Sequence, residues 1–271
     1  MNINHETQLF LSLSSQPGRF GTYVYNRIFR ETSQNCIYKA VKVDNLKDAL
    51  MGVKALGVGG CSIAMPFKEL VIPFLDTLDN SASRVGAVNT VLNRDANLIG
   101  FNTDFLGFSL LLRELNLSRS SRVLLLGSGG AAKAVLAALM DCQFERVMVA
   151  YRNHSSLNSL RSIFPAATVV SWDDREGQEA DLIINATPVG MGRDRESIPI
   201  SESYVQSSKV IFEFINSPIE TGLVKLGRQL NKKVITGDQI SLKQILFQYE
   251  IYTGRPAPKN LVSKIVSSIL S

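Results

Sequence analysis

A glycine-rich segment carries the clearest chemical signal in the sequence. Residues 127–132 read Gly-Ser-Gly-Gly-Ala-Ala, directly after an apolar run at residues 123–126 and before residues that favour a helix. Such a turn brings backbone N–H groups and a helix N-terminus up to a pyrophosphate, so it predicts a dinucleotide site. Ala132 stands where the third glycine of the G-x-G-x-x-G pattern would be, and a plain strand-to-helix turn is the alternative. The predicted cofactor contacts in the turn are Gly127, Ser128, Gly129, Gly130 and Ala131.

The end of the next predicted strand bears on which dinucleotide binds. Residues 150–154 read Ala-Tyr-Arg-Asn-His, with no acid that could hold the ribose 2′-hydroxyl of NAD. The guanidinium of Arg152 can stack on adenine and pair with a 2′-phosphate. A solvated surface arginine would be the default without the glycine turn, and the two features together favour NADP.

A regular alternation of strands and helices must position these residues. It begins after Asp104 with an amphipathic helix at residues 105–115. Strands that read as continuous apolar runs are typical of a parallel sheet buried on both faces, so the sequence predicts an α/β fold. Further strands are expected at residues 123–126, 147–150, 181–185 and 210–214, and helices at 130–142, 155–164 and 220–229.

The chain before Asp104 has a different rhythm and predicts a separate α/β region. Strands are expected at residues 8–11 and 57–64, a hairpin at 88–92 and 98–101, and helices from near Thr22 and over 45–56. Asn45 is a plausible cap for the second of these helices. Two helices with apolar periodicity, at residues 239–252 and 260–270, close the chain.

Composition narrows the class of protein. The 271 residues are 45% hydrophobic and 20% charged, which is typical of a globular chain and excludes intrinsic disorder. The net charge of +5 is spread along the chain, so no nucleic-acid partner is expected. No apolar run approaches the roughly 20 residues of a membrane helix, and the N-terminus lacks a signal-peptide pattern. With 3 scattered cysteines and 2 histidines, a zinc site is not expected, and we predict a cytoplasmic enzyme or binding protein without a metal.

Further motifs lie on both sides of the glycine turn. Residues 64–69 read Ala-Met-Pro-Phe-Lys-Glu, residues 86–90 read Gly-Ala-Val-Asn-Thr, and residues 100–104 read Gly-Phe-Asn-Thr-Asp. In order and spacing they resemble the shikimate dehydrogenase family. The match continues through the glycine turn, Asn-Ala-Thr-Pro-Val-Gly-Met at 185–191, and Gly237 followed by Gln244. On this combination of motifs the chain is identified as a member of the family, from near residue 8 to near residue 254.

The resemblance implies both a fold and a reaction. Residues 1–103 would form a substrate-binding domain and residues 104–237 a Rossmann-like NADP-binding domain. Residues 238–271 would return as helices that pack on the substrate domain. The implied reaction is the reversible reduction of the ketone of 3-dehydroshikimate to shikimate, a step of aromatic amino acid biosynthesis. A small-molecule substrate is expected, and the oligomeric state, monomer or homodimer, is left open.

The resemblance assigns the chemistry to Lys68 and Asp104, both in contact with the hydroxyl that is oxidised. Transfer of a hydride to a carbonyl needs a proton at the oxygen, hence an acid near the alkoxide. The ammonium of Lys68 would stabilise the developing oxyanion, and the carboxylate of Asp104 would orient that ammonium and tune its proton affinity. A lysine considered alone is more often part of a surface ion pair, and the Pro-Phe-Lys-Glu setting argues against that here.

The other site residues follow from the resemblance rather than from their types. The amides that would hydrogen-bond the ring hydroxyls belong to Asn89, Asn102 and Gln244, with a weaker share for Thr103. Thr187 and Met191 would line the nicotinamide, and Gly237 would let the backbone approach the ring closely. Without the motifs, each Asn, Gln or Met would be an ordinary turn, surface or core residue.

The sequence departs from the family where the substrate carboxylate would bind. The family has a Ser-x-Ser-Pro element before its first helix, and this chain has no such element at that place. Counting back from Asn26 places the serine pair on residues 19–22, where only Thr22 retains a hydroxyl, whereas counting forward from the first strand favours Ser12 and Ser14. We favour Thr22, because the second family serine sits where a helix cap is needed.

The sequence departs from the family at two more places, one at a predicted substrate contact and one at the adenine end of the cofactor. The family has an acid, a tyrosine three residues on and a threonine eight residues on, and here these positions are Glu213, Asn216 and Thr221. Ser156 replaces a second basic residue at the adenine end, which weakens discrimination between NADP and NAD. The pattern suits a divergent member with poor activity on shikimate and a preference for a relative such as quinate or an aminated analogue. A non-catalytic NADP sensor is the alternative, and the retention of Lys68 with Asp104 argues against it.

Overall fold

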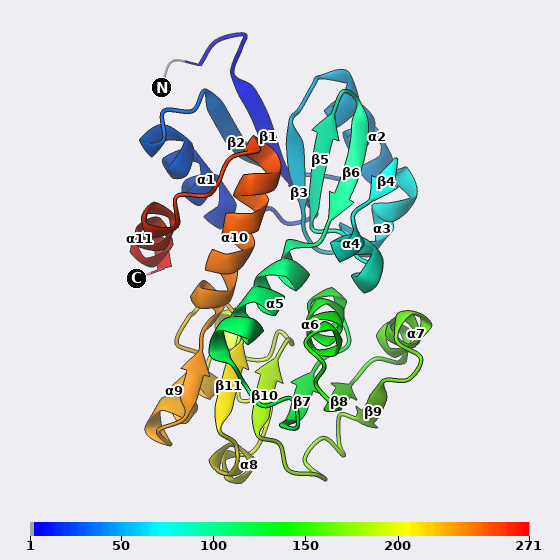
Figure 1. The fold of residues 1–271 in the computed structure, drawn as a ribbon, viewed down its shortest axis with the longest axis vertical. Helices are drawn as coiled ribbons and strands as arrows, with labels where there is room; N and C mark the ends of the chain where they lie inside the picture. Colours follow the sequence, from blue (N-terminus) through cyan, green and yellow to red (C-terminus); the bar gives the residue numbers. More distant parts are fainter. Residues whose placement is uncertain (1–2, 271) are drawn as a thin grey trace. The chain divides into compact units, whose positions relative to one another are not determined.

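The computed structural model describes residues 3–270 and forms two compact units, each built on a sheet (Figure 1). One unit contains the chain up to Thr103 together with Gln244–Ile269, and the other contains Asp104–Lys243. The second change of unit therefore lies inside helix α10 (Gly237–Thr253), between Lys243 and Gln244. Met1, Asn2 and Ser271, at the ends of the domains expected from the sequence, lie outside the described residues.

The first unit is built on a mixed sheet of six strands. β1 lies between β2 and β3 and is parallel to both, whereas β5 is antiparallel to β3 and to β6. In spatial order the strands are β2 (Cys36–Lys42), β1 (Gln8–Ser14), β3 (Gly60–Ile63), β5 (Thr90–Arg94), β6 (Asn97–Phe101) and β4 (Thr77–Leu78). Leu13 packs with Leu50 and Val53 of α2 on one face. On the other face, Phe10 packs against rings of α1 and α10.

The N-terminal ends of two helices of this unit differ in how clearly the sequence marks them. Asn45 caps α2, because its side chain accepts a hydrogen bond from the N–H of Asp48 at 3.3 Å. α1 begins at Phe20, two residues before the expected start near Thr22, and Arg19 rather than Thr22 is in the cap position. The helices are α1 (Phe20–Glu31), α2 (Leu46–Ala55), α3 (Phe67–Leu70), α4 (Asn80–Val85), the end of α10, and α11 (Lys259–Leu270), with a 3₁₀ turn at Ile72–Phe74.

The second unit has a fully parallel sheet of six strands, so the predicted α/β class is confirmed. In spatial order the strands are β12 (Lys233–Ile235), β11 (Val210–Glu213), β10 (Leu182–Asn185), β7 (Arg122–Leu126), β8 (Arg146–Tyr151) and β9 (Thr168–Ser171). Its helices are α5 (Thr103–Leu115), α6 (Gly130–Asp141), α7 (His154–Ile163), α8 (Glu202–Ser207) and α9 (Gly222–Gln229), with a 3₁₀ turn at Gly192–Asp194.

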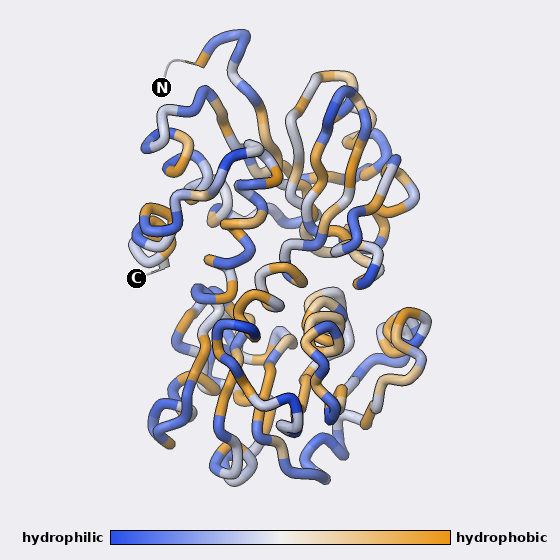
Figure 2. The backbone as a smooth tube through the Cα atoms, viewed as in Figure 1, coloured by the Kyte–Doolittle hydropathy of each residue, from blue (hydrophilic) through white to orange (hydrophobic). Residues whose placement is uncertain are grey.

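The centre of this second sheet is buried on both faces. Leu124, Leu125 and Leu126 of β7 are fully buried, as are Ile183 and Ile184 of β10, and Figure 2 shows hydrophobic residues along these strands. The order of the strands reverses beside β7, because β8 and β9 lie on one side of it while β10, β11 and β12 lie on the other. Ligands of open parallel sheets bind at the carboxyl ends of the strands at such a reversal. The glycine turn follows β7 at that point.

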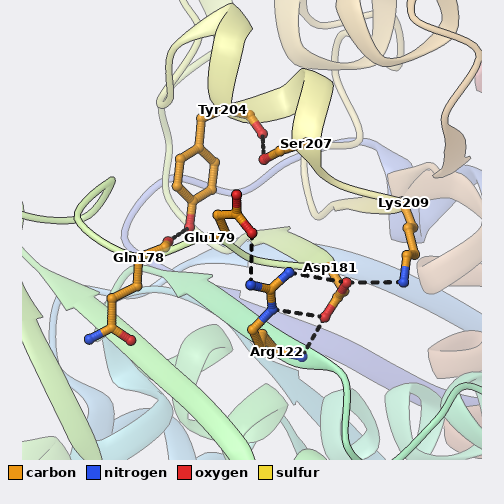
Figure 3. A network of polar contacts seen from close by, with 7 residues as sticks. All are labelled: Arg122, Gln178, Glu179, Asp181, Tyr204, Ser207 and Lys209. Carbon is orange, nitrogen blue, oxygen red and sulfur yellow. Dashed lines mark hydrogen bonds and ion pairs between the residues drawn. The ribbon is translucent and has the colours of Figure 1, made fainter.

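At the amino ends of these strands, opposite to the glycine turn, charged side chains form a network of ion pairs and hydrogen bonds (Figure 3). Asp181, which precedes β10, accepts hydrogen bonds from the backbone N–H and the Nε of Arg122 at 3.0 and 3.1 Å. Lys209, which precedes β11, pairs with Asp181 at 3.1 Å, and Glu179 accepts from Arg122 at 2.9 Å. These contacts lower the pKa of Asp181, chiefly through the side chain of Arg122. Because they lie at the amino ends of the strands, we assign them to stability rather than to ligand binding.

Among residues 3–270, no helix has both the length and the apolar character that crossing a membrane requires.

Candidate active site

The glycine turn has the geometry that an anion needs. Gly127 has a φ of +111°, and a side chain there would meet the carbonyl oxygen of Ala186 at 3.1 Å. Gly129 is the N-cap of α6, no side chain caps this helix end, and a Cβ at Gly129 would point into open space. No side chain therefore satisfies the N–H groups at the start of α6, which is the arrangement in which helix N-termini bind anions. Ala132 is fully buried, which explains why a small residue stands in the third glycine's place.

The adenine end of the predicted site combines an exposed arginine with two paired serines. Arg152 follows β8 directly, and no ion pair engages its guanidinium within the described chain. The hydroxyl of Ser156 donates to the carbonyl oxygen of Asn153 at 2.9 Å and lies 2.6 Å from the hydroxyl of Ser128. Since Ser156 has a single hydrogen, it accepts from Ser128. The contact of Arg152 with a 2′-phosphate stays a prediction.

The predicted nicotinamide contacts lie on the loop after β10. Thr187 donates its hydroxyl hydrogen to Oδ1 of Asn185 at 2.6 Å and accepts from the N–H of Val189 at 3.2 Å. Its hydroxyl is thus occupied within the loop, and its methyl group lies beside Gly127. Met191 follows with an exposed side chain. The structure therefore places Thr187 in contact with the glycine turn. The two motifs, at residues 127–132 and 185–191, are adjacent, as expected if both contact one cofactor.

The buried side chain of Glu213 holds the loop after β10 in place through hydrogen bonds. Glu213, at the end of β11, is completely buried and accepts hydrogen bonds from Nδ2 of Asn185 at 3.0 and 3.1 Å. The hydroxyl of Thr221 donates to it at 2.9 Å, and the N–H of Ile215 at 3.2 Å. Burial raises the pKa of Glu213 to about 7, although these donors oppose the shift. The sequence predicts no role for Glu213 in the site, although an acid at the end of an apolar strand is unusual enough to signal one.

Gly237 is required for a reason that the sequence did not reveal. A Cβ at this position would lie 2.2 Å from the carbonyl oxygen of Ile215 and 2.7 Å from Oδ1 of Asn216. The close approach that excludes a side chain is thus made by the protein's own backbone. Asn216 donates from Nδ2 to the hydroxyl of Ser241 at 2.7 Å, so the residue in the family's tyrosine position ties the loop to α10.

In the first unit, predicted substrate residues meet where β3 ends and β5 begins. The carbonyl oxygen of Lys68 accepts from the N–H of Val88 at 2.7 Å, which places the lysine backbone beside Asn89. The backbone N–H of Thr103 donates to Oδ1 of Asn89 at 2.8 Å, and its hydroxyl does so at 3.1 Å. Asn102 is fully buried and donates to the carbonyl oxygen of Ala87 at 2.8 Å.

The expected cap at Thr22 is not present. Thr22 lies inside α1, and its hydroxyl accepts from the N–H of Ala40 at 3.2 Å. The physical reason for preferring Thr22 is therefore removed. Ser12 lies near Tyr38 and opposes the rise that burial causes in the pKa of that tyrosine, whereas the hydroxyl of Ser14 is buried and has no partner in the described part of the chain. The choice of residue for the substrate carboxylate stays a prediction, with Ser14 the hydroxyl left without a partner.

The last predicted residues are placed by α5 and α10. Asp104 lies in the first turn of α5 and belongs to the second unit, whereas Lys68 is half-buried in the first. Gln244 is half-buried on α10, one turn before the buried Gln248. No group of three or more His, Cys, Asp or Glu side chains suited to a metal occurs within residues 3–270.

Comparison with known proteins identifies the family. Residues 21–91 match the model of the shikimate dehydrogenase substrate binding domain. A shikimate dehydrogenase-like protein of Haemophilus influenzae is 33% identical over 264 residues, covering 97% of this chain and 96% of that protein. A shikimate dehydrogenase (NADP(+)) of Moorella thermoacetica is 33% identical over 255 residues, 90% of this chain and 86% of that protein. A solved structure of a shikimate 5-dehydrogenase-like protein has a TM-score of 0.90 at 32% identity and covers 98% of both chains. The motifs, the fold and these relatives agree, and the chain belongs to the shikimate dehydrogenase family of oxidoreductases.

Proposed function

We propose that this protein interconverts shikimate, or a close analogue, and 3-dehydroshikimate with NADP as the hydride carrier. The observation that carries the proposal is the retention of Lys68 and Asp104 in the family's motifs, because a protein that only sensed NADP would need neither residue. The name of the Moorella thermoacetica relative, shikimate dehydrogenase (NADP(+)), supports both the reaction and the cofactor.

The residues of the second unit suit the cofactor at three points. The uncapped N-terminus of α6 would hold the pyrophosphate, and Arg152 would pair with the 2′-phosphate. Thr187 and the loop fixed by Glu213 would face the nicotinamide, with their orientation set by the hydrogen bonds to Asn185. When bound, NADP accepts or supplies the hydride.

The proton and the oxygen are handled by the chain's own residues. Lys68 would stabilise the oxygen while it is an alkoxide and would transfer the proton to or from it. Asp104 would orient the ammonium of Lys68. Asn89, Asn102, Thr103 and Gln244 would hold the ring, so that the reacting carbon meets the cofactor in one orientation.

We further propose that activity on shikimate itself is low. The family's tyrosine is replaced by Asn216, whose amide is engaged by Ser241, and no Ser-x-Ser-Pro element precedes α1. Substrate oxygens that lose a partner are costly to bury, and the loss affects the transition state as well as binding. A relative of shikimate that lacks or moves the unmatched oxygen would be the better substrate.

A panel of shikimate-like alcohols, including quinate and an aminated analogue, tests the proposal with NADP and with NAD. Reduction of the cofactor is followed by absorbance. We expect turnover with at least one alcohol, a preference for NADP, and a loss on the order of 10²-fold or more in Lys68→Ala, as for other general acid–base groups. A folded enzyme that binds NADP but oxidises none of the alcohols, or a Lys68→Ala variant with normal turnover, would refute the assignment.

A further inference from the structure

A row of hydroxyl groups crosses one face of the first sheet. Ser12, Ser62 and Thr90 are register partners on β1, β3 and β5, since Ser12 pairs with Ser62 and Ser62 with Thr90. The same face is apolar further along β1, where Phe10 stacks on Tyr252 with ring centroids 4.7 Å apart. The row therefore marks the point where this face changes from apolar core to polar surroundings.

The buried side chain of Gln248 reaches this row from α10. Its Nε2 donates to the hydroxyl of Thr90 at 2.6 Å, and its Oε1 accepts from the hydroxyl of Tyr25 on α1 at 2.7 Å. Tyr25 and Thr90 are themselves buried, as is Gln248. A carboxamide held at both ends in this way has a single orientation.

The hydrogen bonds run in one direction. The oxygen of the Gln248 amide can only accept, so Tyr25 is the donor, and the nitrogen can only donate, so Thr90 accepts. The hydrogen of the Thr90 hydroxyl is then free for Oδ1 of Asn89, which lies 3.0 Å away. The order of donors is Tyr25, Gln248, Thr90, and the final acceptor is Asn89.

Asn89 receives more than this one donor. Its Oδ1 also accepts from the backbone N–H and the hydroxyl of Thr103 at 2.8 and 3.1 Å. A rotation that exchanged oxygen and nitrogen would set the NH₂ group against these donors and leave several of them unsatisfied, which is costly in a buried site. Within the described residues, Nδ2 of Asn89 makes no hydrogen bond of its own.

We propose that Tyr25 and Gln248 are positioning residues that hold Asn89 with its NH₂ group toward the substrate. The inference rests on the proposed function, in which Asn89 contacts the ring. Asn89 then offers only donors, so the matching atom of the ligand must be an acceptor. A hydroxyl or ketone oxygen satisfies this requirement, whereas an ammonium carries donors only and has no lone pair to offer. The site therefore selects an oxygen-substituted ring over one with an amino group at this position.

Calorimetric titration of the enzyme saturated with NADP tests this without requiring turnover. The probes are shikimate and analogues in which one ring hydroxyl at a time is replaced by an amino group. We expect the analogue altered at the Asn89 contact to bind at least tenfold more weakly than shikimate. In Gln248→Met and Thr90→Val, the Kd for shikimate should rise about fivefold, the equivalent of a neutral hydrogen bond of ~1 kcal/mol, and discrimination against the amine should fall. Thr90→Ser keeps the donor and should retain wild-type discrimination.

Tyr249→Phe is the matched control. Tyr249 lies beside Gln248 on α10 and accepts a hydrogen bond from Gln34 at 2.6 Å, but this bond does not lead to Asn89. Its loss should leave both Kd values unchanged. Equal shifts in Gln248→Met and Tyr249→Phe, or wild-type binding of every amino analogue as tight as that of shikimate, would overturn the inference. Discrimination in binding without any turnover would instead refute the proposed function and leave the positioning role intact.

Discussion

Replacement of Glu213 by glutamine should remove a specific pH dependence from the stability of the second unit. The carboxyl is completely buried, and its pKa is raised from 4.5 to about 7 by that burial. The folded state therefore binds a proton more tightly than the unfolded chain does. The resulting contribution is fully present below pH 4.5 and is lost as the pH rises to about 7.

The magnitude follows from the shift. At roughly 1.4 kcal/mol per pKa unit, the rise of Glu213 corresponds to about 3 kcal/mol of unfolding free energy. Glutamine is close in size and cannot ionise. Its oxygen can still accept from Asn185, and its NH₂ group can donate to the hydroxyl of Thr221. The stability of Glu213→Gln relative to wild type should therefore increase by about 3 kcal/mol as the pH is raised from 4.5 to 8.

Urea unfolding followed by tryptophan fluorescence measures this change in the correct unit, because the single tryptophan, Trp172, lies within the same part of the chain as Glu213. The control is Glu196→Gln. Glu196 is an exposed acid whose pKa is lowered by its hydrogen bond to Lys225, so its removal should add no such slope above pH 5. A constant difference between wild type and Glu213→Gln from pH 4.5 to 8 would refute the reasoning.

Four further substitutions test other parts of the structure. Arg152→Ala should weaken binding of NADP by about 1.5–3 kcal/mol and leave NAD nearly unchanged in fluorescence titration, and equal weakening of both would show that Arg152 only stacks on adenine. Asp181→Asn should lower the unfolding free energy at pH 7 by about 1.5–3 kcal/mol. Because ion pairing lowers the pKa of Asp181, this difference should shrink as wild type is acidified below about pH 4, and a difference that persists there would contradict the assignment. Ser14→Ala should raise the Michaelis constant for the substrate more than Thr22→Val does, and the reverse order in steady-state kinetics would return the carboxylate contact to Thr22.

The sequence predicted those strands and turns that a short stretch of neighbouring residues is enough to indicate. Four strands of the second sheet, β7, β8, β10 and β11, were recognisable as apolar runs, whereas β9 was not predicted. The turn after β7 was recognisable from its glycines, and Gly127 adopts a φ of +111° that other residues rarely adopt. β2 (Cys36–Lys42) was not predicted, because Lys39 and Lys42 interrupt its apolar pattern at the edge of the sheet. β12 (Lys233–Ile235) is too short for any period to show.

The contacts that shape the candidate site could not be predicted in the same way. Gln248 and Thr90 are 158 residues apart in the chain, and each has an unremarkable neighbourhood in the sequence. The cap of α1 was misassigned to Thr22, because the residue in the cap position, Arg19, makes no side-chain cap hydrogen bond that its type could have signalled. Residue type indicates what a side chain can donate or accept, and the fold decides which partner is close enough to use it.

The two ends of the dinucleotide region differ in their freedom to change. Arg152 is exposed and Ser156 only half-buried, so replacing either disturbs few packed atoms. Asn185 and Glu213 are fully buried and share hydrogen bonds, so a replacement of either must still supply the hydrogen bonds that its partner needs. Under selection for a new cofactor, substitutions should accumulate at the adenine end, while the nicotinamide end stays invariant. Evolution can thus revise which dinucleotide this enzyme prefers without revising how the ring that carries the hydride is held.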